Sequence, residues 1–188
     1  MRGENILLYR EEELPPGRYT VEAVAYDAPS GNASVRRGTI EVPQPDKTKV
    51  SLSSVVIIKR VERMAAAAAD GASPTSNERP LRFEDTLVYP NLGEPVRRGA
   101  NQPLAFFVTV YPATGASEPP KLTIEVLRAG RTTGRASAAL PAPDKTNRIQ
   151  YASALPTEKM QPGEYELKLT VDDGQSRASR TASFTVAP

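Results

Sequence analysis

Apolar and polar residues alternate along much of this chain with the period of two that is typical of half-buried β-strands. The clearest case is segment 164–171, whose apolar residues all fall on one face of a predicted strand: Tyr165, Leu167, Leu169 and Val171. After a turn at 172–175, segment 178–186 continues the pattern, and its inward positions are Ala182, Phe184 and Val186. These two segments predict an antiparallel hairpin with one buried face, on which Leu167, Leu169 and Phe184 are largely buried.

The same pattern occurs near the N-terminus, so the chain contains an internal repeat. Strands are predicted at 18–26 and 34–42, joined by the turn-rich segment 27–32, and their shared apolar face carries Tyr19, Val21, Ala23, Ala25, Ile40 and Val42. The motif at 16–19, Pro-Gly-Arg-Tyr, matches Pro-Gly-Glu-Tyr at 162–165. We predict a loop two residues longer in the first copy. Each tyrosine is either part of a tyrosine corner or a core residue after a turn.

Further strands are predicted at 50–61, 81–89, 104–111, 121–128, 132–140 and 148–155, with Gly130-Arg131 as a tight hairpin connection. The Ala- and Ser-rich segment 64–79 predicts a flexible surface loop. The chain is therefore predicted to be all-β, and residues 46–188 to form a complete antiparallel β-sandwich of seven or eight strands, immunoglobulin- or fibronectin-III-like. Residues 1–45, with strands at 6–9, 18–26 and 34–42, are expected to be the C-terminal half of a truncated sandwich.

Composition narrows the chemistry. The chain has 188 residues with no Cys and no His, which excludes thiol nucleophiles, zinc–thiolate sites and His-based acid–base catalysis. The net charge of +2 is spread along the chain, so no nucleic-acid partner is expected. No apolar run reaches the length of a membrane span, and residues 1–6 do not resemble a signal peptide.

Several groups of residues suit either a binding site or an ordinary structural role. Asp27, Asp172 and Asp173 suit a calcium site or simple turns, and turns are favoured because no spaced series of oxygen ligands accompanies them. The pairs Arg36-Arg37 and Arg97-Arg98 are interpreted as solvated charges. A sugar platform would need two or three aromatic side chains on one exposed face, but core packing is favoured for the candidates: Tyr89, Phe106, Phe107, Tyr111 and Tyr151.

Three further motifs are assigned no site. Glu11-Glu12-Glu13 is interpreted as a solvated run, and Asn32-Ala33-Ser34 matches a glycosylation sequon without bacterial relevance. Pro-Asp-Lys-Thr occurs at 45–48 and 143–146 and is interpreted as shared turn chemistry. No catalytic, cofactor-binding or metal-binding residue is predicted.

Four segments resemble the C-terminal β-sandwich region of bacterial von Willebrand factor A-related proteins, common in acidobacteria: 14–27, 52–57, 87–112 and 140–174. The metal-binding Asp-x-Ser-x-Ser motif of an A domain is absent from the sequence. The resemblance therefore implies only context, namely an extracellular or periplasmic location within a larger secreted protein.

We expect a non-catalytic structural or protein-interaction module. Its partner is expected to be a protein or a neighbouring domain, and the 1–45 segment is expected to allow self-association. The alternative is a module that binds envelope polysaccharide.

Overall fold

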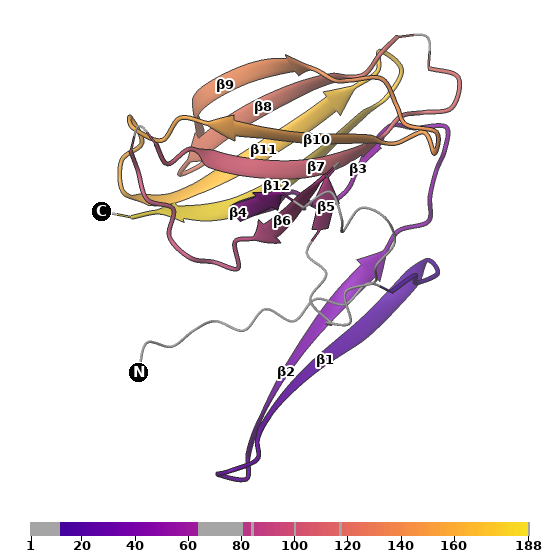
Figure 1. Ribbon diagram of the computed structural model, residues 1–188. Helices are drawn as coiled ribbons and strands as arrows, with labels where there is room; N and C mark the ends of the chain where they lie inside the picture. The colour runs from indigo at the N-terminus through magenta and orange to yellow at the C-terminus, as the bar shows by residue number, and fades with distance from the viewer. Residues whose placement is uncertain (1–11, 64–80, 84, 100, 117, 188) are drawn as a thin grey trace. The chain divides into compact units, whose positions relative to one another are not determined.

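The computed structural model describes residues 12–63, 81–83, 85–99, 101–116 and 118–187, and these residues are all-β, with antiparallel sheets and no helix (Figure 1). They divide into two compact units, a hairpin within residues 12–46 and a sandwich within 47–187. The strand predicted at 6–9 and the loop predicted at 64–79 lie outside the described residues. Within the described ranges, no helix has the length and apolarity that crossing a membrane requires.

The sandwich unit has two sheets. The first has the order β10-β7-β4-β6-β5, with β3 also paired to β7. Its strands are β3 (Ser51–Leu52), β4 (Val56–Arg63), β5 (Leu81–Phe83), β6 (Thr86–Pro90), β7 (Leu104–Tyr111) and β10 (Ile149–Leu155). The second sheet has the order β12-β11-β8-β9. Its strands are β8 (Lys121–Arg128), β9 (Arg131–Ala139), β11 (Gly163–Asp172) and β12 (Arg177–Val186).

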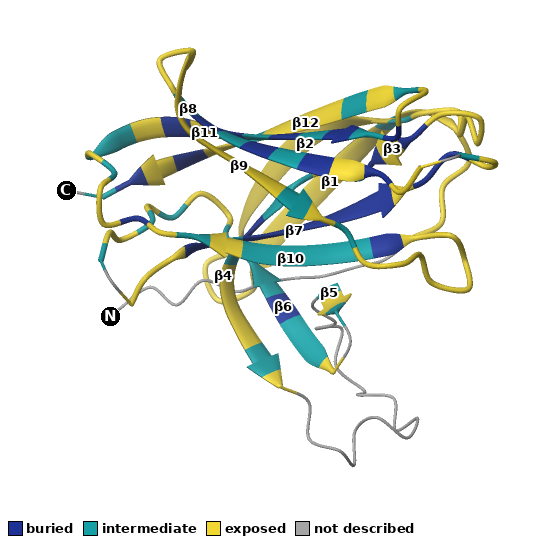
Figure 2. Ribbon diagram, turned by 90° about the horizontal axis from the view of Figure 1, so that it is seen from above, coloured by how far each residue is buried: buried dark blue, intermediate teal, exposed yellow. Residues whose placement is uncertain are grey.

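The core lies between the two sheets and follows the predicted alternation. Leu167 and Leu169 on β11 are fully buried and Phe184 on β12 is 8% exposed, as predicted. The next residues along each strand face solvent or are half-buried, which Figure 2 shows as alternating colours along β11 and β12. Leu122, Ile124 and Val126 continue the buried face onto β8. The predicted fold class is therefore confirmed as an antiparallel β-sandwich, while the immunoglobulin or fibronectin type stays a prediction.

The prediction of a single strand at 50–61 is wrong, because the chain leaves the sheet between β3 and β4. Both strands pair with β7. Ser53 fills the interruption: its backbone N–H donates to the Thr109 carbonyl at 2.9 Å, and its Oγ accepts from the Thr109 N–H at 2.9 Å. A side-chain oxygen thus replaces a missing backbone partner.

The prediction of one strand at 81–89 is also wrong. This segment is a hairpin in which Leu81 on β5 pairs with Val88 on β6, and Asp85 lies in the turn. Because both predicted strands are split, the described part of the sandwich unit has the ten strands β3 to β12 rather than seven or eight.

The tight connection between β8 and β9 lies one residue earlier than predicted. Arg128 pairs with Arg131, so the two loop residues are Ala129 and Gly130. Both have positive φ, 49° and 73°, as the favoured two-residue hairpin turns require.

The β12 side of the sandwich is closed by loop contacts. Val96 forms a parallel bridge with Val186, and the Val96 N–H donates to the Thr185 carbonyl at 2.7 Å. At the other end of β12, the Val50 N–H donates to Ser176 Oγ at 2.9 Å. These contacts connect both ends of β12 to segments far away in sequence.

Candidate interaction surface

The first hairpin is formed by β1 (Gly17–Asp27) and β2 (Asn32–Val42). Its register places Tyr19 opposite Ile40 and Val21 opposite Gly38. Because side chains alternate between faces, one face carries the six apolar residues that were predicted to share it: Tyr19, Val21, Ala23, Ala25, Ile40 and Val42. We call this set the apolar hairpin face.

The two copies of the repeat share a tyrosine hydrogen bond. The Tyr19 hydroxyl donates to the Pro15 carbonyl at 2.7 Å, and the Tyr165 hydroxyl donates to the Gln161 carbonyl at 2.9 Å. Each bond reaches back four residues across a Pro-Gly turn. The tyrosine-corner interpretation is therefore confirmed for both copies.

The two hairpins also share their register at the turn end. Gly17 pairs with Val42 and Tyr19 with Ile40 in the first copy, and Gly163 pairs with Val186 and Tyr165 with Phe184 in the second. The prediction of a longer loop in the first copy is wrong, because residues 28–31 and 173–176 connect the strands in loops of equal length. The two extra residues lengthen the strands instead, one in each.

Burial distinguishes the copies. Leu167 and Leu169 are 0% exposed beneath the facing sheet, whereas Val21 is 47% exposed and Ile40 is 42% exposed. Val24, Tyr26 and Val35, on the opposite face near the hairpin tip, are also exposed. The first hairpin thus repeats the geometry of a core hairpin while its large apolar side chains face solvent.

The second face of the hairpin, which carries Val24, Tyr26 and Val35 near the tip, also carries charged residues. Glu22 on β1 and Arg37 on β2 are cross-strand partners, and Glu22 Oε1 lies 2.5 Å from Arg37 Nε. Arg36 pairs with Ala23 on the apolar hairpin face and is exposed. The pair at 36–37 therefore places one cation on each face.

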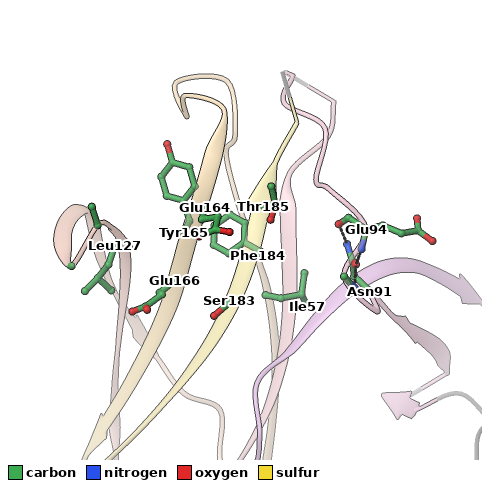
Figure 3. A pocket seen from close by; sticks show the side chains of 13 residues that line it. Ile57, Asn91, Glu94, Leu127, Glu164, Tyr165, Glu166, Ser183, Phe184 and Thr185 are labelled. Carbon is green, nitrogen blue, oxygen red and sulfur yellow. Dashed lines mark hydrogen bonds between the residues drawn. The ribbon is translucent and has the colours of Figure 1, made fainter. Parts of the chain in front are cut away.

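The sandwich unit contains a pocket of about 440 Å³ between β8, β11, β12 and the loop at 91–94 (Figure 3). Three carboxylates line it: Glu94, Glu164 and Glu166. Glu94 is paired with Lys59, and Asn91 Oδ1 accepts from the backbone N–H groups of Gly93 and Glu94. Figure 3 shows Asn91 and Glu94 on one side of the pocket and Tyr165 on the other.

Tyr165 is one of the lining residues of the pocket, and its hydroxyl is already engaged by the backbone. The Tyr165 Oη donates to the Gln161 carbonyl and accepts from the Gln161 N–H at 3.0 Å. Its ring stacks on Phe184 with centroids 5.5 Å apart. The side chain therefore fixes the turn before β11 and anchors the core hairpin.

A second groove, of about 480 Å³, opens beside β9. Gly134 and Ala136 on β9 pair with Val126 and Ile124 on β8, and all four residues line the groove. Arg128, Arg135 and Lys159 contribute the charged lining groups. Sequence reasoning missed this groove. The signal was present in the small residues at alternate positions 134, 136 and 138 of the predicted strand.

The candidate aromatic residues do not share one exposed face. Phe106 and Phe107 are buried, and Tyr151 packs on Phe106 with centroids 6.3 Å apart. Arg60 covers the Tyr89 ring at 3.8 Å, whereas Tyr111 is 40% exposed. The structure thus uses most of these rings in packing.

The candidate aspartates serve as turn residues. Asp173 is buried, which raises the pKa of its carboxyl, but N–H donors from Ser176 at 2.7 Å and Gln175 at 3.0 Å, with the Ser176 hydroxyl, outweigh that effect and lower the pKa. A hydrogen bond from the Gly174 N–H, followed by the Arg177 guanidinium, lowers the pKa of Asp172. Asp27 accepts from the Ser30 hydroxyl. Among the described residues no cluster of three or more metal-binding side chains occurs.

The Pro-Asp-Lys-Thr motif at 143–146 also forms a turn. Asp144 Oδ1 accepts from the Thr146 hydroxyl at 2.7 Å and from the N–H groups of Thr146 and Arg148. The Thr146 hydroxyl, followed by the Arg148 N–H, lowers the pKa of Asp144 to about 2. This copy therefore follows the predicted turn chemistry.

The remaining candidates lie apart from one another. Arg97 and Arg98 are exposed after the Val96 bridge, and Glu12 and Glu13 are exposed before the first Pro-Gly turn, whereas Glu11 lies outside the described residues. Asn32 begins β2 opposite Asp27. The structure brings none of these groups together with the pocket or with the groove beside β9.

The chain matches no protein-family model and no curated protein. The resemblance to von Willebrand factor A-related proteins therefore stays a prediction.

Proposed function

We propose that this chain is a non-catalytic protein-interaction module of a secreted, extracellular or periplasmic bacterial protein related to von Willebrand factor A proteins. The observation that carries the proposal is a hairpin that occurs twice with the same register and the same tyrosine bond, buried once and exposed once. The sandwich provides a folded scaffold, and the apolar hairpin face provides the contact surface.

The physical argument rests on the cost of exposed apolar surface. A two-stranded hairpin is marginally stable in water, and contiguous apolar patches mark interaction sites. Covering the apolar hairpin face with a protein surface removes Val21 and Ile40 from water, as the facing sheet does for Leu167 and Phe184. The resemblance of 14–27 and 140–174 to secreted bacterial proteins supports the location.

We propose a selection that compares protein and glycan ligands directly. The full chain is immobilised and used to select random twelve-residue peptides displayed on phage, and it is also applied to a glycan array. We expect the chain to select peptides whose binding is lost in the double variant Val21→Asp/Ile40→Asp, because a carboxylate on this face cannot be desolvated by an apolar partner.

Thr20→Asp/Thr39→Asp is the matched control, because it adds the same charges on the opposite face of the same hairpin. Glycan binding that disappears in Tyr89→Ala or Tyr111→Ala, with no selected peptide, would overturn the proposal in favour of a polysaccharide-binding module. Circular dichroism of each variant establishes that the sandwich remains folded.

A further inference from the structure

Within the described residues, one edge of the first hairpin is open, whereas the corresponding edge of the second copy is paired. In the sandwich, β11 pairs with β12 on one side and with β8 on the other, from Glu166 opposite Leu127 to Asp172 opposite Lys121. Within the described residues, β1 pairs with β2 alone. A strand edge with unpaired N–H and C=O groups is a template for one more strand.

The second copy shows which strand would fit. Aligning Tyr19 with Tyr165 makes Val21 equivalent to Leu167 and Glu22 equivalent to Lys168. The β11 segment from Glu166 onward, which pairs with β8, therefore corresponds to the β1 segment that begins at Thr20. We propose that this edge of β1 accepts an antiparallel β-strand of another polypeptide, with apolar residues at alternate positions and a basic residue opposite Glu22. The inference rests on the proposed interaction function and specifies its partner.

The apolar requirement follows from the equivalent positions of β8. Val126 lies opposite Leu167 and Ile124 opposite Leu169, and all four side chains are buried. The equivalents of the two leucines in β1 are the smaller Val21 and Ala23. A complementing strand with Leu, Ile or Val at these positions would extend the apolar hairpin face and provide the volume that the smaller side chains lack.

The charge requirement follows from a reversal between the copies. Glu125 on β8 lies opposite Lys168, and Glu125 Oε2 is 3.9 Å from Lys168 Nζ. The first copy has Glu22 where the second has Lys168. A strand with Glu at the position of Glu125, such as β8 of another copy of this chain, would place its carboxylate opposite the carboxylate of Glu22, and the two would repel each other. Lys or Arg at that position instead restores an attractive cross-strand pair.

Two synthetic peptides test this charge rule. One has the sequence of residues 119–130, which includes β8, and the other is its Glu125→Lys variant. Fluorescence polarisation titrations at low salt measure their binding to the full chain. We expect the Lys peptide to bind about two- to fivefold more tightly than the Glu peptide, as one exposed ion pair provides.

The double variant Glu22→Lys/Arg37→Glu keeps the cross-strand ion pair within the hairpin but reverses the charge beside the edge. We expect it to reverse the preference, so that the Glu peptide binds more tightly. Glu41→Lys is the matched control. Glu41 lies on the same face of the hairpin as Glu22 but on β2, away from the open edge of β1, so this variant should leave the preference unchanged.

The outcomes separate this inference from the proposed function. Peptides that bind through Val21 and Ile40 without any charge preference would overturn the edge register while the interaction function stands. Absence of binding by these and by all phage-selected peptides would overturn both. If sedimentation shows a dimer that the peptides do not dissociate and that Val21→Asp does dissociate, then a second copy covers the surface, and the separate strand is wrong.

Discussion

The two repeat tyrosines make the same hydrogen bond in different surroundings. Tyr165 is 5% exposed, and its hydroxyl both donates to and accepts from the backbone of Gln161. Tyr19 donates to the Pro15 carbonyl on an exposed hairpin. A hydrogen bond contributes most when water cannot replace the lost partner.

Tyr165→Phe should therefore lower the free energy of unfolding by about 1–3 kcal/mol, because it leaves two backbone groups of Gln161 without a partner in a half-buried turn. Tyr19→Phe should cost less than about 0.5 kcal/mol, because solvent reaches the Pro15 carbonyl. Denaturant unfolding of both variants measures the difference. Equal losses of unfolding free energy would show that burial does not strengthen the tyrosine hydrogen bond of the second copy.

Asp173 links the loop of the second hairpin to acid stability. Its carboxyl has a lowered pKa in the folded chain, so the unfolded chain takes up a proton first as the pH falls. The stabilisation is present above the unfolded pKa of about 4 and is lost as the pH falls through the lower folded value.

The difference in unfolding free energy between the wild type and Asp173→Asn should therefore shrink as the pH is lowered from about 6 to about 2. Denaturant melts at several pH values, with Asp144 intact in both proteins, measure it. A difference that stays constant with pH would show that the Asp173 carboxylate contributes shape rather than charge.

At the scale of the element, β11 and β12 supply several of the side chains that fill the core between the two sheets. Tyr165 and Phe184 are cross-strand partners with stacked rings, and both face the other sheet. Phe184→Ala removes one ring of this pair and leaves a cavity.

Phe184→Ala should cost about 3–5 kcal/mol, and Thr185→Ala, on the solvent face of the same strand, should cost less than about 1 kcal/mol. Denaturant melts compare the two variants. A loss below about 1 kcal/mol for Phe184→Ala would mean that the faces are reversed, because a one-residue slip exchanges them.

Alternation predicted these strands well, but it could not locate the interruptions. Segment 55–58 is a β-branched run that continues smoothly after β3, and only the hydrogen bonds of Ser53 with Thr109 reveal where the chain leaves the sheet. Asp85 lies in the turn before Thr86, but the sequence there has neither Gly nor Asn, so alternation did not separate the two short strands.

The candidate surface was only half predictable. The apolar residues of 18–42 and their shared face follow from the sequence, because strand periodicity fixes them. The equal hairpin loops, the Glu22–Arg37 pair and the groove beside β9 depend on register and on packing across strands, which a single sequence does not encode locally.

At the scale of the whole molecule, the chain consists of two units that meet in sequence at residues 46 and 47. Hydrogen bonds at both ends of the sandwich unit, from Val50 to Ser176 and from Val96 to Thr185, lie within residues 47–187. The sandwich core also draws all its residues from this unit.

Deleting residues 1–45 should therefore leave 46–188 folded and more monomeric than the full chain, because the deletion removes the apolar hairpin face and no core residue. Thermal unfolding by circular dichroism and sedimentation velocity test both parts. Loss of the cooperative transition would show that the two units share one core and that a boundary near residue 45 is wrong.

The contacts at the two ends of β12 also give the sandwich a mechanical direction. A pulling force applied between Lys49 and Ala187 acts along β12. The neighbour of Lys49, Val50, is hydrogen-bonded to Ser176 just before β12 begins, and Ala187 directly follows the last residue of β12. All ten residue pairs with β11 then carry the load together in shear, whereas a force between Glu164 and Ala187 opens the ladder one pair at a time. Single-molecule pulling tests this direction. Because the chain contains no cysteine, handles can be attached at engineered thiols without side reactions. The rupture force should be higher for pulling between Lys49 and Ala187 than for pulling between Glu164 and Ala187. Equal forces would mean that β12 is released before its hydrogen bonds with β11 are loaded.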